Sequence, residues 1–140
     1  FHWLNMPSIL IVEDHKIVAD VLANILRRGQ FEVAGMVHTA EDALERLSGQ
    51  AVDLVLVDVS LPDTNGIELV AMIHEKYPLI PSIVISGHNT SIYVNRSFNA
   101  GARGYIVKDD IHDIVEGIQH VLDGDTYLSK QLDRSNLNKS

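Results

Sequence analysis

Four short runs of consecutive apolar residues punctuate the chain, and a polar residue directly follows each one. The runs are Ile9–Val12, Leu54–Val57, Ile83–Ile85 and Tyr105–Val107. Apolar runs without alternation are typical of strands buried on both faces, as in a parallel sheet. Val33–Val37 is a fifth run, and its glycine and lower apolarity favour a strand at the edge of that sheet.

The segments between these runs have the periodicity of amphipathic helices, and the weakest of them covers Thr90 to Ala100. Thr39 is the expected N-cap of the second helix, and Asp109 or Asp110 that of the last. Pro78 ends the third helix. The apolar faces are predicted to consist of Ile17, Val18, Val21, Leu22, Ile25 and Leu26; of Ala40, Ala43, Leu44 and Leu47; of Ile67, Val70, Met72 and Ile73; and of Ile111, Ile114, Val115, Ile118, Val121 and Leu122.

Strands and helices therefore alternate as β/α units, which predicts an α/β fold with helices on both faces of a parallel sheet. A chain of 140 residues without internal repeats is expected to form one domain. We assign residues 1–7 to an N-terminal extension. Within it, Met6 looks like the natural first residue of the protein. Residues 8–128 form the domain, and residues 129–140, which are polar and lack periodicity, form a linker or tail.

Composition narrows the class of protein. The chain has no cysteine, which excludes disulfides, thiol catalysis and thiolate metal sites. Its formal net charge of −8 argues against direct DNA binding by this segment. No apolar stretch reaches the roughly twenty residues of a membrane span, and no signal peptide is visible. We therefore expect a cytoplasmic protein without membrane association.

The polar residues after the strands carry the candidate chemistry. They are Glu13 and Asp14, Asp58, Ser86 and Lys108. In a parallel sheet these strand ends meet at one edge, where open α/β sheets bind ligands. The carboxylates suit a divalent cation, and the hydroxyl and the lysine suit an oxyanion beside it. Because a carboxylate attacks phosphorus, Asp58 is the candidate nucleophile for phosphoryl transfer.

Taken together, four segments resemble the receiver domain of two-component response regulators. They are Glu13-Asp14, the segment from Asp58 to Gly66, Ser86-Gly87 and the segment from Gly104 to Lys108. The resemblance covers about Ser8 to Leu128. Within the family, the segments 61–66 and 124–129 are similar to the NarL/FixJ branch, whose members usually continue into a LuxR-type helix-turn-helix domain.

The resemblance implies a flavodoxin-like (βα)5 fold with strand order 2-1-3-4-5. It also implies that Asp58 accepts a phosphoryl group from a sensor histidine kinase with Mg²⁺, for which Mn²⁺ is a possible substitute. The backbone carbonyl of Ser60 joins Glu13, Asp14 and Asp58 as metal ligands. Ser86 and Tyr105 form a switch, and a homodimer is possible. Such a receiver is a signalling protein rather than an enzyme, and DNA binding belongs to a C-terminal domain outside this chain.

Some residues depart from the family pattern. The acidic pair begins with Glu13 in place of aspartate, and Ser86 replaces the commoner threonine. Asp109 follows Lys108 where many receivers have proline, so we predict a trans peptide bond there. Gly117 lies inside the last predicted helix, where it costs about 1 kcal/mol relative to alanine, without an evident function.

The same residues allow other interpretations. Asp14 alone is also a plausible helix N-cap, and Tyr105 a fixed core aromatic. A phosphatase of the haloacid-dehalogenase class needs a second carboxylate two residues after the nucleophile, where Ser60 stands. A flavin or nucleotide module needs a phosphate-binding loop where the acidic pair Glu13-Asp14 stands. Gly87 and His88 are expected to border the site. No metal-ligand spacing is evident among the histidines, which we interpret as surface residues: His2, His15, His38, His74, His88, His112 and His120.

Overall fold

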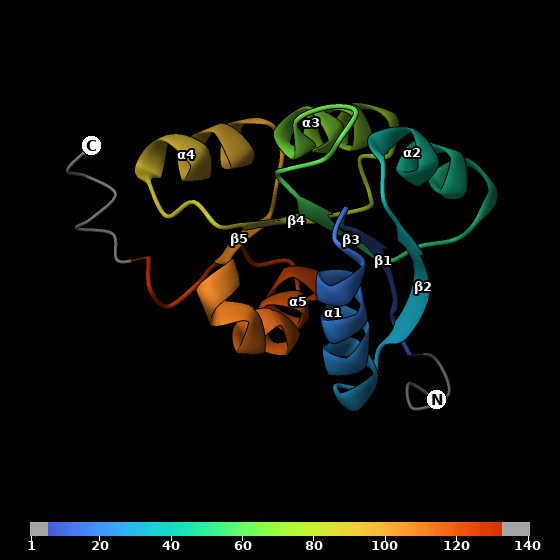
Figure 1. Ribbon diagram of the computed structural model, residues 1–140, viewed down its shortest axis with the longest axis horizontal. Coiled ribbons are helices and arrows are strands. Elements are labelled where there is room, and N and C mark those ends of the chain that lie inside the picture. The colour runs from blue at the N-terminus through green and yellow to red at the C-terminus, as the bar shows by residue number, and fades with distance from the viewer. Residues whose placement is uncertain (1–5, 133–140) are drawn as a thin grey trace.

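A six-stranded parallel sheet forms the centre of the molecule in the computed structural model, which describes residues 6–132 (Figure 1). The strand order is β2-β1-β3-β4-β5-β6. The predicted order 2-1-3-4-5 is confirmed, and a short sixth strand adds to it beside β5. The strands are β1 (Ser8–Val12), β2 (Glu32–Val37), β3 (Leu54–Asp58), β4 (Ser82–Ser86), β5 (Gly104–Val107) and β6 (Tyr127–Leu128).

Helices cover both faces of this sheet, which buries the apolar strands on each side (Figure 1). One face packs against α1 and α5, and the other against α2, α3 and α4. The helices are α1 (Lys16–Arg28), α2 (Ala40–Gly49), α3 (Gly66–Lys76), α4 (Ser91–Asn99) and α5 (Ile114–Leu122), with a 3-10 helix, η2 (Lys108–Asp113), before α5. None of the helices within residues 6–132 is long and apolar enough to span a membrane.

The predicted inner face of α1 is wrong in part. Ile17 is 79% exposed and Val21 is 43% exposed, whereas Ala19 and Ala23 are buried together with Leu22 and Leu26. The small alanines lie on the side that packs against the sheet, so the buried stripe is rotated toward them. In α3, Leu69 takes the buried place that was expected for Met72, which is 40% exposed.

The start of the last helix also differs from the prediction. Neither Asp109 nor Asp110 caps an α-helix, because residues 108–113 form η2 and the α-helix begins at Ile114. Thr39 is confirmed as the cap of α2, since its side chain accepts a hydrogen bond from the Asp42 N–H. The peptide bond after Lys108 is trans, as predicted.

The close approach of α5 to the sheet explains Gly117. A Cβ atom at this position would lie 2.9 Å from Cδ2 of Tyr127 and 3.0 Å from Cδ1 of Ile106. Packing continues past Leu128, where we had placed the end of the domain. Ser129 and Leu132 are buried, and the Ser129 hydroxyl accepts a hydrogen bond from the Val107 N–H. The rest of the predicted tail, residues 133–140, and residues 1–5 of the extension lie outside the described residues.

Candidate functional site

The strand register brings the predicted polar residues to one edge of the sheet. Val12 of β1 pairs with Val57 of β3, so Glu13 and Asp58 follow side by side. Asp58 pairs with Ile85, the residue before Ser86. Ser86 in turn pairs with Val107, the residue before Lys108. Residues that are distant in the sequence therefore surround Asp58, because each ends or follows a neighbouring strand.

Two buried carboxylates and one lysine form the centre of this edge. Glu13 is 1% exposed and Asp58 is 2% exposed. The Lys108 Nζ atom lies 3.2 Å from Asp58 Oδ1 and 3.6 Å from Glu13 Oε1. A single cation thus contacts both carboxylates, which leaves one negative charge in excess at a place with little access to water.

The electrostatics of Asp58 reflect this excess. Burial raises the pKa of Asp58, and the neighbouring Glu13 carboxylate raises it further. Lys108 lowers the pKa again, and the result is about 6, against an ordinary value of 3.8. Carboxylates with a strongly shifted pKa cluster at functional sites, because burial and neighbouring charges are arranged there to suit the chemistry.

The unpaired oxygens fit a divalent cation. Among residues 6–132, the buried Glu13 Oε1 and Asp58 Oδ2 atoms have no hydrogen-bond partner. Such atoms are costly unless a ligand or an ion satisfies them. Hard carboxylate oxygens are the donors that Mg²⁺ prefers. Of the other predicted metal ligands, Asp14 is exposed beside this pair, and Ser60 is exposed in the loop after β3.

Ser86 and Tyr105 belong to a small hydrogen-bonded group at the start of the β4–α4 loop. The Ser86 hydroxyl accepts a hydrogen bond from the His88 N–H at 2.9 Å, and the Tyr105 hydroxyl donates to the His88 carbonyl at 2.6 Å. Burial raises the pKa of Tyr105, and the hydrogen bond with the Ser86 hydroxyl offsets part of this rise. The His88 ring stacks on Tyr93 of α4, with the ring centroids 4.1 Å apart. Tyr105 is fully buried.

The loop after Asp58 is fixed by contacts that the sequence did not reveal. The Asp63 carboxylate accepts hydrogen bonds from the Ala40 and Glu41 N–H groups, the first of α2. These bonds lower the pKa of Asp63. At Gly66, an added Cβ atom would clash with the Asp58 carbonyl oxygen. The turn signal in this segment was visible, but its partner helix and its tight approach to β3 required the tertiary structure.

His15 lies closer to the carboxylate pair than the sequence indicated. Its side chain is 64% exposed, as expected of a surface histidine, yet one ligand atom from each of Glu13, His15 and Asp58 lies within 4.8 Å of the other two. Its Nδ1 atom is 3.5 Å from Glu13 Oε2. Its position two residues after Glu13, at the start of α1, was a signal that could have indicated this proximity.

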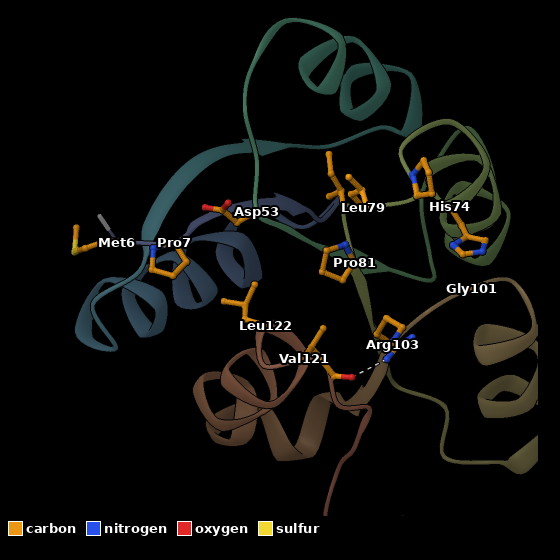
Figure 2. Close-up of a pocket in the computed structure, with 13 residues that line it drawn as sticks. Met6, Pro7, Asp53, His74, Leu79, Pro81, Gly101, Arg103, Val121 and Leu122 are labelled. Atoms are coloured by element: carbon orange, nitrogen blue, oxygen red, sulfur yellow. Dashed lines mark hydrogen bonds between the residues drawn. The ribbon is translucent and has the colours of Figure 1, made fainter. Parts of the chain in front are cut away.

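A hollow lies at the opposite edge of the sheet (Figure 2). It has a volume of about 600 Å³, and Pro7, Leu79, Pro81, Arg103 and Leu122 are among the residues that line it. Its charged groups already have partners. Asp53 accepts a hydrogen bond from the Ser8 N–H, and Arg103 donates one to the Gly124 carbonyl. Size alone therefore does not mark this hollow as the functional site.

Comparison with known proteins identifies the family. Residues 9–119 match the family model described as the response regulator receiver domain. Curated relatives include the transcriptional regulatory protein DegU of Brevibacillus brevis, 29% identical over 89% of this chain and 53% of the relative. Another is the transcriptional regulatory protein MctR of Rhizobium johnstonii, 32% identical over 86% of this chain and 58% of the relative. The chain thus spans between half and two thirds of the length of these relatives.

Solved structures agree with the sequence relatives. A two-component response regulator of the LuxR family from an Aurantimonas species superposes with a TM-score of 0.89 at 26% identity, over 96% of this chain and 97% of that chain. A CheY-like receiver domain protein from Methanospirillum hungatei has a TM-score of 0.78 at 32% identity, over 86% and 96% of the two chains. The chain therefore belongs to the response regulator receiver domain family, in which it resembles regulators of the LuxR (NarL/FixJ) type.

Proposed function

We propose that Asp58 is the phosphoacceptor of this receiver and takes its phosphoryl group from a phosphohistidine of a partner sensor kinase. The observation that carries this proposal is the isolation of the Asp58 carboxylate. It is buried at the end of β3, it contacts Lys108 Nζ at 3.2 Å, and its second oxygen has no partner among the described residues. Glu13 shares the burial and the lysine, but Asp58 is itself the last residue of its strand and lies closer to Lys108 Nζ, at 3.2 Å against 3.6 Å.

In the proposed transfer, an Asp58 oxygen forms a bond to phosphorus as the P–N bond of the phosphohistidine breaks. The electron pair of that bond stays on the kinase imidazole, which takes up a proton. Lys108 then faces a phosphoryl group as well as a carboxylate, and its flexible stem allows it to follow the added charge. Ser86 has a hydroxyl proton to donate to a phosphoryl oxygen, because its oxygen acts as the acceptor for the His88 N–H.

We propose Mg²⁺, with Mn²⁺ as a substitute, as the cation of the reaction. Glu13, Asp14, Asp58 and the Ser60 carbonyl are the proposed donors. When bound, the cation supplies positive charge that neutralises the carboxylates and the phosphoryl oxygens. The unpaired oxygens of Glu13 and Asp58 support this assignment, since a buried site with excess negative charge favours a cation.

The output is proposed to lie outside this chain. The curated relatives are named as transcriptional regulators and are longer than this chain, so we propose that a C-terminal helix-turn-helix domain binds DNA. The proposed place of action is the cytoplasm, and the proposed assembly is a homodimer. In this proposal the receiver also assists its own phosphorylation and dephosphorylation at Asp58. It does not contact DNA itself, in keeping with its formal net charge of −8. A sequence-specific gel shift by residues 1–140 in moderate salt would contradict that part.

A small phosphodonor tests the proposed function. Incubation with acetyl phosphate and Mg²⁺ should add one phosphoryl mass to the intact protein. Asp58→Asn should abolish the gain, whereas Asp123→Asn, at an exposed carboxylate at the end of α5, should leave it unchanged. Labelling that persists in Asp58→Asn would refute the assignment.

We further propose that Ser86 reports phosphorylation to α4 through Tyr105. A phosphoryl oxygen that accepts the Ser86 hydroxyl proton draws this side chain toward the site, which lengthens its bond from the His88 N–H. Because Tyr105 holds the His88 carbonyl and the His88 ring stacks on Tyr93, the change reaches α4 directly. Amide exchange should therefore change between Ser86 and Tyr105 when beryllofluoride and Mg²⁺ are added. Unchanged protection with the mimic bound would exclude this route.

A further inference from the structure

His15 is held beside the carboxylate pair by its own backbone. It is the N-cap residue of α1, yet its side chain makes no capping hydrogen bond. Its N–H donates to Glu13 Oε2 at 3.2 Å, and its Nδ1 lies 3.5 Å from the same oxygen. The imidazole is therefore positioned next to Glu13 and has no structural task in the helix that it starts.

The same place contains buried groups that lack partners. The Glu13 Oε1 and Asp58 Oδ2 atoms are inaccessible to water and make no hydrogen bond within the described part of the chain. One ligand atom from each of Glu13, His15 and Asp58 lies within 4.8 Å of the other two, so a small movement of the side chains would bring all three to a single ion. A nitrogen donor and buried oxygens without hydrogen-bond partners thus belong to the same three residues, although the Glu13 oxygen nearest to His15 Nδ1 is Oε2 and the one without a partner is Oε1.

A nitrogen donor changes which cation such a site prefers. Mg²⁺ favours oxygen ligands and retains several waters. Imidazole suits first-row transition ions, and affinity for nitrogen-containing sites rises along the series from Mn²⁺ to Cu²⁺. We propose that His15 is a metal ligand of the receiver site and makes it selective for transition ions such as Co²⁺ and Zn²⁺ over Mg²⁺. The proposal rests on the proposed function only in that both place a cation beside Asp58.

The competing explanation is a charge contact. A protonated His15 would pair with Glu13 and would compete with any cation for that carboxylate. The two explanations predict opposite effects of His15→Ala. Loss of a ligand weakens Co²⁺ binding and changes Mg²⁺ binding little, whereas loss of a competing charge strengthens the binding of both ions.

Titration of the 140-residue chain with Co²⁺ separates these explanations. Visible absorption reports the Co²⁺ ligand field, and calorimetry gives the affinities for Co²⁺ and Mg²⁺. We expect His15→Ala to weaken Co²⁺ binding by about tenfold or more and to change Mg²⁺ binding by less than about threefold. His120→Ala removes an exposed imidazole on α5 and should change neither affinity. Circular dichroism confirms that each variant is folded.

A cysteine at the same position gives a second readout. Because the chain contains no cysteine, His15→Cys introduces its only thiol. A thiolate that reaches the ion should restore Co²⁺ binding and produce a sulfur-to-cobalt charge-transfer band in the near ultraviolet. Asp58→Asn should weaken Co²⁺ binding as well, which places the ion at the receiver site rather than at a surface histidine.

Three results would overturn the proposal: no Co²⁺ binding by the unmodified chain, unchanged or tighter Co²⁺ binding by His15→Ala, or equal losses of Co²⁺ and Mg²⁺. The titrations contain no phosphodonor. Failure of Asp58 phosphorylation would therefore leave this result intact, and failure of His15 as a ligand would leave the phosphorylation result intact.

Discussion

The two edges of the central sheet treat their charged groups in opposite ways. At the edge that Figure 2 displays, Asp53 and Arg103 are exposed and each is hydrogen-bonded to a backbone group. At the other edge, Glu13 and Asp58 are buried and each has an oxygen without a partner in the described residues. The first edge contains a hollow of about 600 Å³, but the charged side chains of Asp53 and Arg103 there are already hydrogen-bonded. Unsatisfied buried charge, rather than open volume, therefore distinguishes the edge at which we propose that a ligand binds.

The largest effect is expected when Lys108, the cation that contacts both Glu13 and Asp58, is replaced. In Lys108→Met, two buried carboxylates lose their shared partner, so the free energy of unfolding should fall by about 3 kcal/mol in EDTA. Urea unfolding measures this, and Mg²⁺ should restore part of the loss. Arg103→Met removes a cation from the opposite edge and should cost less than about 1 kcal/mol. Equal losses in the two variants would remove the distinction between the edges.

Asp58→Asn should stabilise the protein when no metal is present. Because the pKa of Asp58 is raised from 3.8 to about 6 in the folded protein, folding favours the protonated form. Its contribution to stability is complete below about pH 4 and is lost as pH rises through 6. Asp58→Asn should therefore gain roughly 2 kcal/mol at pH 8 in EDTA and nothing near pH 4. Urea titrations at both pH values measure this gain, and a constant difference would contradict the raised pKa.

Gly66→Ala tests how tightly α3 approaches the end of β3. A Cβ atom there would clash with the Asp58 carbonyl oxygen, so we expect a loss of about 2 kcal/mol and slower labelling of Asp58. The matched control is Gly49→Ala, because nothing lies within 4 Å of a Cβ at that position. Alanine should be neutral there or should stabilise α2 slightly. Thermal unfolding of both variants decides the point, and a neutral Gly66→Ala would show that the loop relaxes freely.

The smallest effect is expected at Asp63. Asp63→Ala removes two hydrogen bonds to the first N–H groups of α2, while the Thr39 cap on Asp42 remains. We expect a loss of about 1 kcal/mol at pH 7. Because hydrogen bonding lowers the pKa of Asp63, the difference from the unmodified chain should shrink as pH falls below 4. Stability measured at pH 7 and pH 3 checks this, and an effect that grows in acid would contradict it.

Sequence patterns predicted the parts of the fold that depend on long apolar runs. The strands and the meeting of Glu13, Asp58 and Lys108 at one edge followed from runs buried on both faces, whereas the strand order came from the resemblance to receiver domains. The face of α1 did not, because hydrophobicity favours Ile17 whereas close packing on the sheet favours the small Ala19. Polarity likewise concealed Ser129, which is buried because its hydroxyl satisfies a backbone N–H of β5.

The candidate site was predictable as a set of strand ends but not as a geometry. Asp14 remains a predicted metal ligand, whereas the presence of His15 in the group of ligand atoms within 4.8 Å of one another was not expected. Whether Asp14 or His15 turns toward Glu13 depends on the backbone conformation at the start of α1, where His15 is the N-cap residue. Asp63 was readable only as a turn residue, because its partners in α2 lie more than twenty positions away in the sequence.

The most direct test of the central claim is to read the modified residue itself. Phosphorylation with acetyl phosphate and Mg²⁺, followed by borohydride, reduces an aspartyl phosphate to homoserine, which peptide sequencing by mass spectrometry locates. We predict homoserine at position 58 alone, and none when Mg²⁺ is replaced by EDTA. Homoserine at any other aspartate, or a phosphoryl group retained on a serine or histidine, would contradict the assignment of Asp58 as the phosphoacceptor.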